Sequence, residues 1–235
     1  MVVVRQPSFF LYITIQKTDK NTLLFAHIKN ILYLCNMNAM RYEKEDLQEA
    51  VRVLKAGGII LYPTDTVWGI GCDATNAEAV RKIYALKQRE DSKSMLCLID
   101  GAGKLQGYAD VPDAAWQLLE ATTPEEGLEQ RPLTIIYPNA RNIAANLIAE
   151  DGSIGFRITN EPFSKALCEQ LHHPIVSTSA NISGQPTAKN FRQISDEIKN
   201  GVDYVCRFRQ SDCEEKKPSV IIKVGTKNEI EIIRK

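Results

Sequence analysis

The spacing of hydrophobic and polar residues divides most of the chain into alternating helices and strands. Leu47, Ala50, Val51 and Leu54 fall on one stripe of a helix, the pattern of a helix that buries one face. Short apolar runs that end at proline or glycine are typical of buried strands. On these criteria we expect helices at residues 43–56, 76–87, 111–120, 162–171 and 191–199. We expect strands at residues 58–62, 95–99, 133–137, 154–158, 174–178, 219–224 and 229–233.

This alternation predicts an α/β fold: a single domain with a twisted mixed β-sheet and flanking helices. Residues 1–36 have no amphipathic period or capping signal, so an extra strand or a disordered tail is the simplest interpretation. We favour a start-site extension, with the functional chain beginning at Met37 or Met40. The predicted division is therefore an N-terminal extension at residues 1–39 and a functional domain at residues 40–235.

Composition narrows the classes of function. Lys+Arg and Asp+Glu both number 29, so only a local basic cluster could recruit nucleic acid. The cysteines lack the C-x₂-C spacing of zinc sites and the histidines form no convincing ligand set, so we expect no bound metal. The apolar run at residues 9–15 is short and no cleavage site follows it. We therefore expect a cytoplasmic protein with reduced thiols and no membrane association.

Four polar segments follow or interrupt predicted strands, where open α/β sheets bind ligands. They are residues 63–71, residues 87–94, Arg157 inside an apolar strand, and residues 177–187. Each also has a structural interpretation: a tight turn, a surface charge run, an ion pair of the buried arginine, and a Ser/Thr-rich turn. Taken together, their hydroxyls and cations predict a large concave cleft that binds anions.

One known family carries similar motifs in the same order: Tyr62-Pro63-Thr64-Asp65-Thr66-Val67-Trp68-Gly69, Lys87-x-Arg89 and Ser177-Thr178-Ser179-Ala180-Asn181-x-Ser183-Gly184. Over about residues 43–235 the chain resembles the short, single-domain members of the YrdC/Sua5/TsaC family, the threonylcarbamoyl-AMP synthases. The resemblance implies a YrdC-like fold that condenses L-threonine, bicarbonate and ATP, with Mg²⁺ carried by the ATP, to L-threonylcarbamoyladenylate and pyrophosphate. It also implies a downstream threonylcarbamoyl transferase complex that modifies adenosine 37 of tRNA, and at most weak tRNA contact.

The same resemblance implies roles for particular residues. Both reactants are anions, so cations must hold them together, and the implied catalytic residues are Lys87 and Arg89, which would also grip the ATP phosphates. The residues implied to contact threonine are Thr64, Thr66, Arg157 and Ser179. The further residues implied to contact ATP are Thr134, Asn181, Ser219 and Arg234.

Two other functions stay open. One is carbamoyl adenylation in hydrogenase maturation, although the related module there lies in a much longer chain with zinc-binding cysteine pairs. The other is a non-catalytic RNA-binding module that uses the same basic cleft. The zero net charge and the few aromatic residues outside apparent core positions argue against strong nucleic-acid binding.

Overall fold

The computed structural model describes residues 2–6, 9–13, 44–88, 95–122, 131–213 and 215–235. The chain divides into two compact units, Met1–Asp46 and Leu47–Lys235. In the first unit, β1 (Val2–Gln6) and β2 (Phe9–Ile13) pair antiparallel. The sequence pattern suggested at most one extra strand here. That residues 1–39 are an extension without function stays a prediction.

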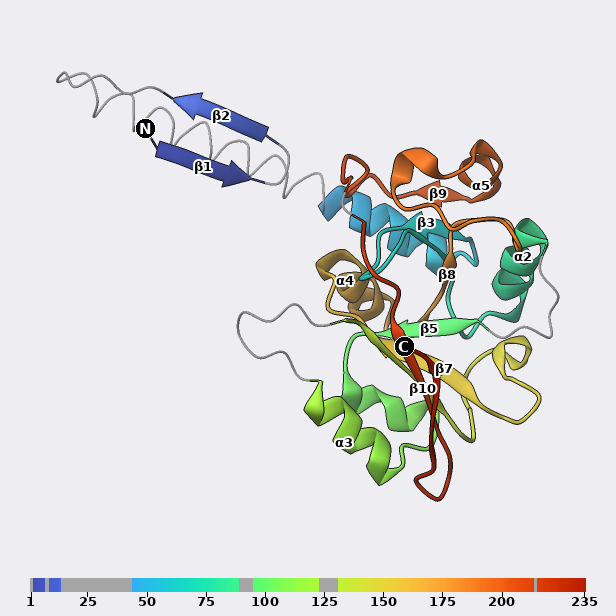
Figure 1. Cartoon of the computed structure of the whole chain (residues 1–235). Helices are drawn as coiled ribbons and strands as arrows, with labels where there is room; N and C mark the ends of the chain where they lie inside the picture. Colours follow the sequence, from blue (N-terminus) through green and yellow to red (C-terminus); the bar gives the residue numbers. More distant parts are fainter. Residues whose placement is uncertain (1, 7–8, 14–43, 89–94, 123–130, 214) are drawn as a thin grey trace. The chain divides into compact units, whose positions relative to one another are not determined.

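The second unit is built on a mixed sheet (Figure 1). Within the described residues its strand order is β11-β10-β6-β7-β5-β8-β4-β3-β9, with both parallel and antiparallel neighbours. The strands are β3 (Ile60–Tyr62), β4 (Gly69–Gly71), β5 (Leu96–Ile99), β6 (Leu133–Tyr137), β7 (Ile154–Ile158), β8 (Ile175–Ser179), β9 (Tyr204–Val205), β10 (Val220–Val224) and β11 (Ile230–Arg234). This architecture confirms the predicted α/β class with a mixed sheet.

The helices flank this sheet, and most of them lie where the pattern predicts. They are a helix at residues 44–55, α2 (Ala77–Lys87), α3 (Asp113–Ala121), α4 (Pro162–Leu171) and α5 (Asp196–Gly201). Three 3₁₀ turns complete the described elements: η1 (Ala102–Gly107), η2 (Ala145–Leu147) and η3 (Phe191–Gln193). None of the helices in the described ranges combines the length and hydropathy that crossing a membrane requires.

The predicted helix at residues 191–199 is wrong, because the segment breaks into η3 and α5. Ser195 separates the two elements in an extended conformation, with φ −64° and ψ 150°. Its side chain accepts a hydrogen bond from the backbone N–H of Ile198, so it caps a new helix instead of continuing the earlier turn.

Helix α2 is fixed at both ends, which determines where Lys87 lies. The side chain of Asn76 accepts hydrogen bonds from the N–H groups of Glu78 and Ala79, both at 3.1 Å. After Lys87, Gln88 takes a left-handed conformation with φ 50° and closes the last turn. Lys87 is therefore the last residue of α2 and the first residue of the polar segment predicted at residues 87–94.

Two hydrophobic cores cover the two faces of the sheet, because alternate residues of a strand point to opposite sides. Leu61 of β3 packs in the core that includes Val80 of α2. Its neighbour Tyr62 packs in the other core, with Leu54 of the helix at residues 44–55 and Leu167 of α4. Helices from distant parts of the sequence therefore hold β3 and the turn after it from both sides.

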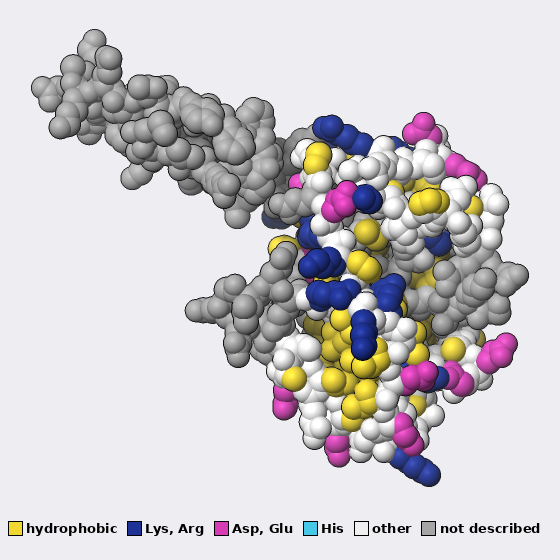
Figure 2. All heavy atoms as spheres, viewed as in Figure 1, with side chains coloured by type: hydrophobic (Ala, Val, Ile, Leu, Met, Phe, Trp, Pro, Cys, Tyr) yellow, Lys and Arg dark blue, Asp and Glu magenta, His cyan; other side chains and the backbone are white. Residues whose placement is uncertain are grey.

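At one edge of the sheet, β11 pairs with β10 and otherwise contributes little to either core. All five of its residues are exposed, and Ile230, Ile232 and Ile233 are the large hydrophobic residues with high exposure among the described side chains. In Figure 2, Lys and Arg side chains gather near the C-terminus and hydrophobic side chains gather over β10 and β11.

Strand β4 was not expected, because its two glycines suggested a ligand-binding turn. The structure places Gly69–Gly71 between β3 and β8 inside the sheet. A Cβ atom added at Gly71 would lie 2.6 Å from both the Tyr62 ring and the Val176 carbonyl oxygen. The glycine is therefore required by close packing of neighbouring strands. The two-residue strand β9 is too short for a hydrophobic period to reveal.

Replacing Gly71 with alanine is expected to lower the free energy of unfolding by about 3 kcal/mol, because buried backbone and ring atoms would have to move. Urea denaturation of the full chain measures this change. Gly103→Ala is the matched control, since no atom lies within 4 Å of its added Cβ. Similar stabilities for the two variants would contradict the packing argument.

Candidate active site

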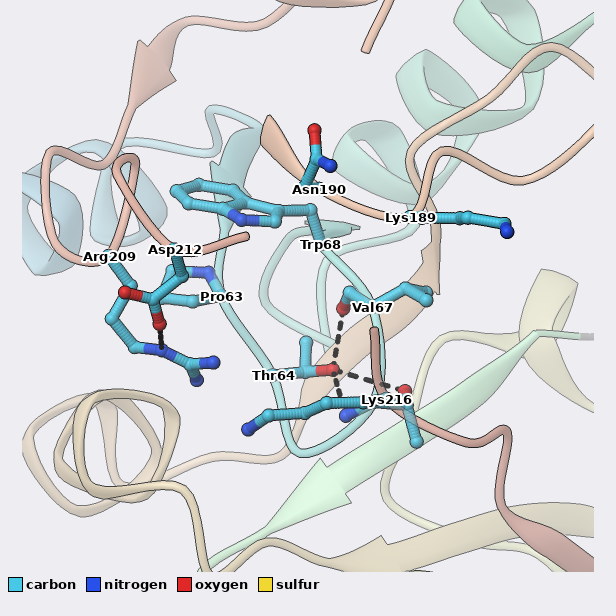
Figure 3. A pocket seen from close by; sticks show the side chains of 10 residues that line it. Pro63, Thr64, Val67, Trp68, Lys189, Asn190, Arg209, Asp212 and Lys216 are labelled. Carbon is cyan, nitrogen blue, oxygen red and sulfur yellow. Dashed lines mark hydrogen bonds and ion pairs between the residues drawn. The ribbon is translucent and has the colours of Figure 1, made fainter. Parts of the chain in front are cut away.

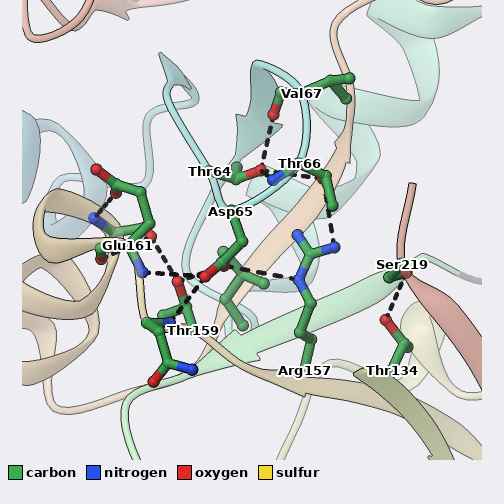
Figure 4. Close-up of polar contacts among 12 residues, drawn as sticks. Thr64, Asp65, Thr66, Val67, Thr134, Arg157, Thr159, Glu161 and Ser219 are labelled. Carbon is green, nitrogen blue, oxygen red and sulfur yellow. Dashed lines mark hydrogen bonds and ion pairs between the residues drawn. The ribbon is translucent and has the colours of Figure 1, made fainter. Parts of the chain in front are cut away.

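The first group of predicted site residues consists of Thr64 and Thr66, in the turn after β3, and Arg157 of β7. Thr64 Oγ1 donates to the Val67 carbonyl at 2.7 Å and accepts from the Thr66 N–H at 3.1 Å (Figure 4). The Thr64 hydroxyl is therefore occupied in holding the turn. The side chain of Thr66 instead extends toward Arg157, whose Nη1 donates to Thr66 Oγ1 at 3.4 Å. The segment is thus a hydrogen-bonded turn, as the structural interpretation predicts. It also brings Thr64, Thr66 and Arg157 together, as the ligand-site interpretation predicts.

Arg157 lies on β7 and is buried, with 3% of its surface exposed. Its Nε lies 3.8 Å from Asp65 Oδ2, an ion pair without a hydrogen bond. Burial lowers the pKa of the Arg157 guanidinium and Asp65 opposes that change; an arginine nevertheless stays charged. Nε is buried and has no hydrogen-bond partner among the described residues. An unmet buried donor is costly, so this atom is suited to an acceptor that a ligand brings.

Asp65 was not among the predicted site residues, although its charge faces Arg157. Its Oδ1 accepts hydrogen bonds from the N–H groups of Asn160 and Glu161, at 2.8 and 3.0 Å. Its Oδ2 accepts from the Thr159 hydroxyl at 2.6 Å. Sequence reasoning showed that a buried Arg157 needs a partner, but no local signal connects a turn after β3 with a strand far along the chain.

The second group consists of Thr134, Ser219 and Arg234, three residues implied to contact ATP. The hydroxyl oxygens of Thr134 and Ser219 lie 3.0 Å apart, and both residues are buried. Arg234 donates from Nη2 to Ser219 Oγ and from Nε to the Ser219 carbonyl, both at 3.0 Å. The structure thus brings together residues from β6, β11 and the segment before β10.

The sheet connects this second group to Arg157. In the register of β6 with β7, Ile135 lies opposite Phe156, so Thr134 and Arg157 are the next residues along these neighbouring strands (Figure 4). On the other side of β6, Thr134 lies opposite Ile221 of β10, which in turn lies opposite Arg234 of β11. Burial is the main cause of the lowered pKa of Arg157, and Asp65 and Tyr62 oppose it. The positive charge of Arg234 makes a smaller contribution that also lowers this pKa. Two arginines and several hydroxyls therefore share one region, which favours a bound anion between them.

The third group joins Lys87 to the hydroxyl-rich loop. Lys87 is buried, and its Nζ donates to the carbonyl oxygens of Ser179 and, at 2.6 Å, Asn181. The Ser183 N–H in turn donates to the Lys87 carbonyl at 2.9 Å. Lys87 thus points toward the 177–183 segment, as the cleft hypothesis requires, and its Nζ contacts backbone carbonyls there. Arg89 lies outside the described residues.

The side-chain amide of Asn181 holds its loop through the NH₂ group, while its oxygen has no hydrogen-bond partner among the described residues. Its Nδ2 donates to the carbonyls of Ile182 and Gln185, each at 2.9 Å. Its Oδ1 is buried without a hydrogen-bond partner among the described residues. The loop is also tied to the first group, because the Ala180 N–H donates to the Trp68 carbonyl at 3.0 Å.

A surface hollow lies beside the Thr64–Trp68 turn (Figure 3). Its lining residues are Pro63, Thr64, Thr66, Val67, Trp68, Lys189, Asn190, Arg209, Asp212 and Lys216. Its three cations, Lys189, Arg209 and Lys216, were not among the predicted site residues, because they lie outside the four polar segments that follow or interrupt the predicted strands. Arg209 is held by Asp212 at 2.6 Å and Lys189 by Glu215 at 3.0 Å. The large predicted cleft that joins all three groups stays a prediction.

The fold and these three groups define an α/β protein whose sheet presents cations beside hydroxyls, an arrangement that suits anionic ligands. The model of the Sua5/YciO/YrdC family, described as "Telomere recombination", matches residues 52–235. The chain therefore belongs to the Sua5/YciO/YrdC family.

Curated relatives and solved structures agree with this assignment. The chain is 34% identical over 157 residues to a threonylcarbamoyl-AMP synthase of Photobacterium profundum, covering 66% of this chain and 82% of the relative. It is 36% identical over 149 residues to one of Saccharophagus degradans, covering 63% and 75%. The crystal structure of E. coli YciO is 25% identical, with a TM-score of 0.69 and coverage of 82% and 89%. The structure of P. abyssi Sua5 complexed with L-threonine is 22% identical, with a TM-score of 0.65 and coverage of 76% and 50%, and shows the shared fold.

Proposed function

We propose that this chain is an L-threonylcarbamoyladenylate synthase, a nucleotidyltransferase that condenses L-threonine, bicarbonate and ATP and releases pyrophosphate. The observation that carries the proposal is that the sheet places Arg157 and Arg234 in one region, each hydrogen-bonded to a hydroxyl group, in a chain whose relatives are named threonylcarbamoyl-AMP synthases. Lys87 adds a third cation, which holds the loop at residues 177–183. A reaction between two anions needs such cations to offset the repulsion between the reactants.

The threonine end of the reaction fits the first group. Threonine nitrogen adds to CO₂ with loss of a proton, or condenses with bicarbonate with loss of water, to give an N-carboxylate, while the amino-acid carboxylate stays free. The Nε–H of Arg157, which lacks a partner among the described residues, is suited to donate a hydrogen bond to that free carboxylate, beside the hydroxyl of Thr66. We assign Thr64 a supporting role, because its hydroxyl already holds the turn. Ser179 stays a proposed threonine contact.

The nucleotide end fits the second and third groups. The N-carboxylate attacks the α-phosphorus of ATP, and negative charge develops on the phosphate oxygens. Thr134, Ser219 and Arg234 are proposed to hold the nucleotide, together with Asn181. Lys87 and Arg89 are the proposed catalytic cations, and Mg²⁺ would arrive with ATP as part of that substrate. The further proposals are a downstream threonylcarbamoyl transferase complex, at most weak tRNA contact and a cytoplasmic location.

Pyrophosphate release by the purified chain tests the proposal. Release from ATP is expected only when L-threonine and bicarbonate are both present, and mass spectrometry should detect L-threonylcarbamoyladenylate. Release that ignores threonine would point to another adenylation reaction. No release under any condition, together with retention of RNA, would favour the non-catalytic RNA-binding module.

Ser219→Ala is expected to raise KM for ATP by about tenfold, because a hydrogen bond to a charged group contributes about 1.5–3 kcal/mol. KM for L-threonine should change little, since the lost hydroxyl holds Arg234 and Thr134. Steady-state kinetics with each substrate varied in turn measures both constants. Ser153→Ala is the control, because that hydroxyl bonds Asp151 at 2.6 Å, away from the site groups. An equal rise in both KM values would argue against a nucleotide-specific role.

A further inference from the structure

Asp65 and Arg157 form an ion pair that is almost fully buried. The exposed fractions of their side chains are 10% and 4%. Because water screens such charges poorly, each strongly affects the other even at 3.8 Å. A buried guanidinium without a counter-charge would be very unfavourable, so Asp65 offsets that cost in the absence of a bound anion.

Asp65 provides this charge without occupying the hydrogen-bond donors of Arg157. Its two oxygens are taken by the hydroxyl of Thr159 and by the N–H groups of Asn160 and Glu161. The nearest donor of Arg157, Nε, is too far away for a hydrogen bond and has no partner among the described residues. Asp65 thus compensates the charge of Arg157 and still leaves the Nε–H of Arg157 available to a ligand.

We propose that Asp65 is the resident counter-ion of Arg157: it stabilises the buried guanidinium when no anion is bound and limits how tightly that guanidinium holds the carboxylate of L-threonine. This inference rests on the proposed function, which supplies the carboxylate. The adenylate product still carries that carboxylate, so a moderate grip favours product release. Asp65 acts through Arg157 and is therefore a positioning residue.

Asp65→Asn separates charge from hydrogen bonding. Asparagine can accept the same two backbone N–H groups, and its amide can donate to Thr159, whose hydroxyl lies 2.7 Å from Ser164 Oγ and can donate there. The expected result is a lower melting temperature without ligand and a larger rise on adding L-threonine than in the wild-type protein. KM for L-threonine is expected to fall about fivefold or more, because a neighbouring negative charge is gone, while kcat does not rise.

Two further variants keep this test decisive. Thr159→Val removes a hydrogen bond to Asp65 but keeps the charge, so it should lower the melting temperature without lowering KM for L-threonine. In an Arg157→Gln background, Asp65→Asn should no longer enlarge the L-threonine-induced rise in melting temperature.

Different results would contradict the counter-ion inference and the proposed synthase function. If the wild-type chain shows threonine-dependent pyrophosphate release but D65N has an unchanged or higher KM for L-threonine, Asp65 only braces its turn and the counter-ion inference is wrong. If the wild-type chain releases no pyrophosphate and L-threonine leaves its melting temperature unchanged, the proposed function fails, and the inference fails with it.

Discussion

Lys87→Ala is expected to lower kcat/KM for threonine-dependent pyrophosphate release by about 10²-fold or more, the size of effect typical of losing one donor to a developing negative charge. The structure adds a second reason. Lys87 Nζ holds the carbonyls of Ser179 and Asn181, so its loss also releases the loop that carries the hydroxyls. We therefore expect a lower melting temperature as well as lower activity.

Arg81→Ala is the control for Lys87→Ala, because Arg81 lies on the same helix with 53% of its side chain exposed. Its ion pair with Glu78 at 2.8 Å is of the exposed kind that contributes about 0–1 kcal/mol. Initial rates at low substrate concentration measure kcat/KM for both variants. Equal losses would mean that the cations act only as a diffuse field, and the specific role of Lys87 would have to be abandoned.

Arg157→Gln is expected to have the other large effect, a fall in kcat/KM of about 10²-fold or more that appears chiefly as a higher KM for L-threonine. It should also lower the free energy of unfolding by about 3–5 kcal/mol, because Asp65 would be left as a buried carboxylate without its counter-charge. Steady-state kinetics and urea denaturation measure the two effects separately.

Arg157→Lys distinguishes the ion pair from recognition of the substrate. A lysine keeps the positive charge beside Asp65, so much of the stability should return. It lacks the planar fork of arginine, so KM for L-threonine should remain high. If lysine restores both properties, the role of Arg157 reduces to the buried ion pair and the proposed carboxylate contact is wrong.

The hydrophobic pattern predicted the fold well wherever an element was long and sharply bounded. The bounds of β6, β7 and α4 agree with the prediction, because each element ends at a proline, a charge or a polar turn. Strand β4 was missed because Gly69–Gly71 has no period to read, and its place depends on neighbours distant in the sequence. The split of residues 191–199 depends on one capping serine that competes with helix propensity.

The candidate site was predictable as a set of residue types but not as a set of contacts. The motif residues Thr66 and Arg157 do meet, and Ser219 meets Arg234. The part played by Asp65 could not be predicted, since only the folded sheet brings it to Arg157. The same is true of the contacts that Lys87 makes with backbone carbonyls, because every residue type has such a carbonyl and the sequence therefore gives no signal for them.

The position of β11 at the edge of the sheet separates one proposed nucleotide contact from the residues that hold the fold together. Arg234 lies on the edge strand β11, whose five residues are all exposed. Removing residues 230–235 would therefore take no residue from either hydrophobic core. A chain without these residues should therefore keep both cores and yet lack one proposed contact with the nucleotide. Mass spectrometry of the intact chain should therefore show that the C-terminal residues are present before specific activity is measured.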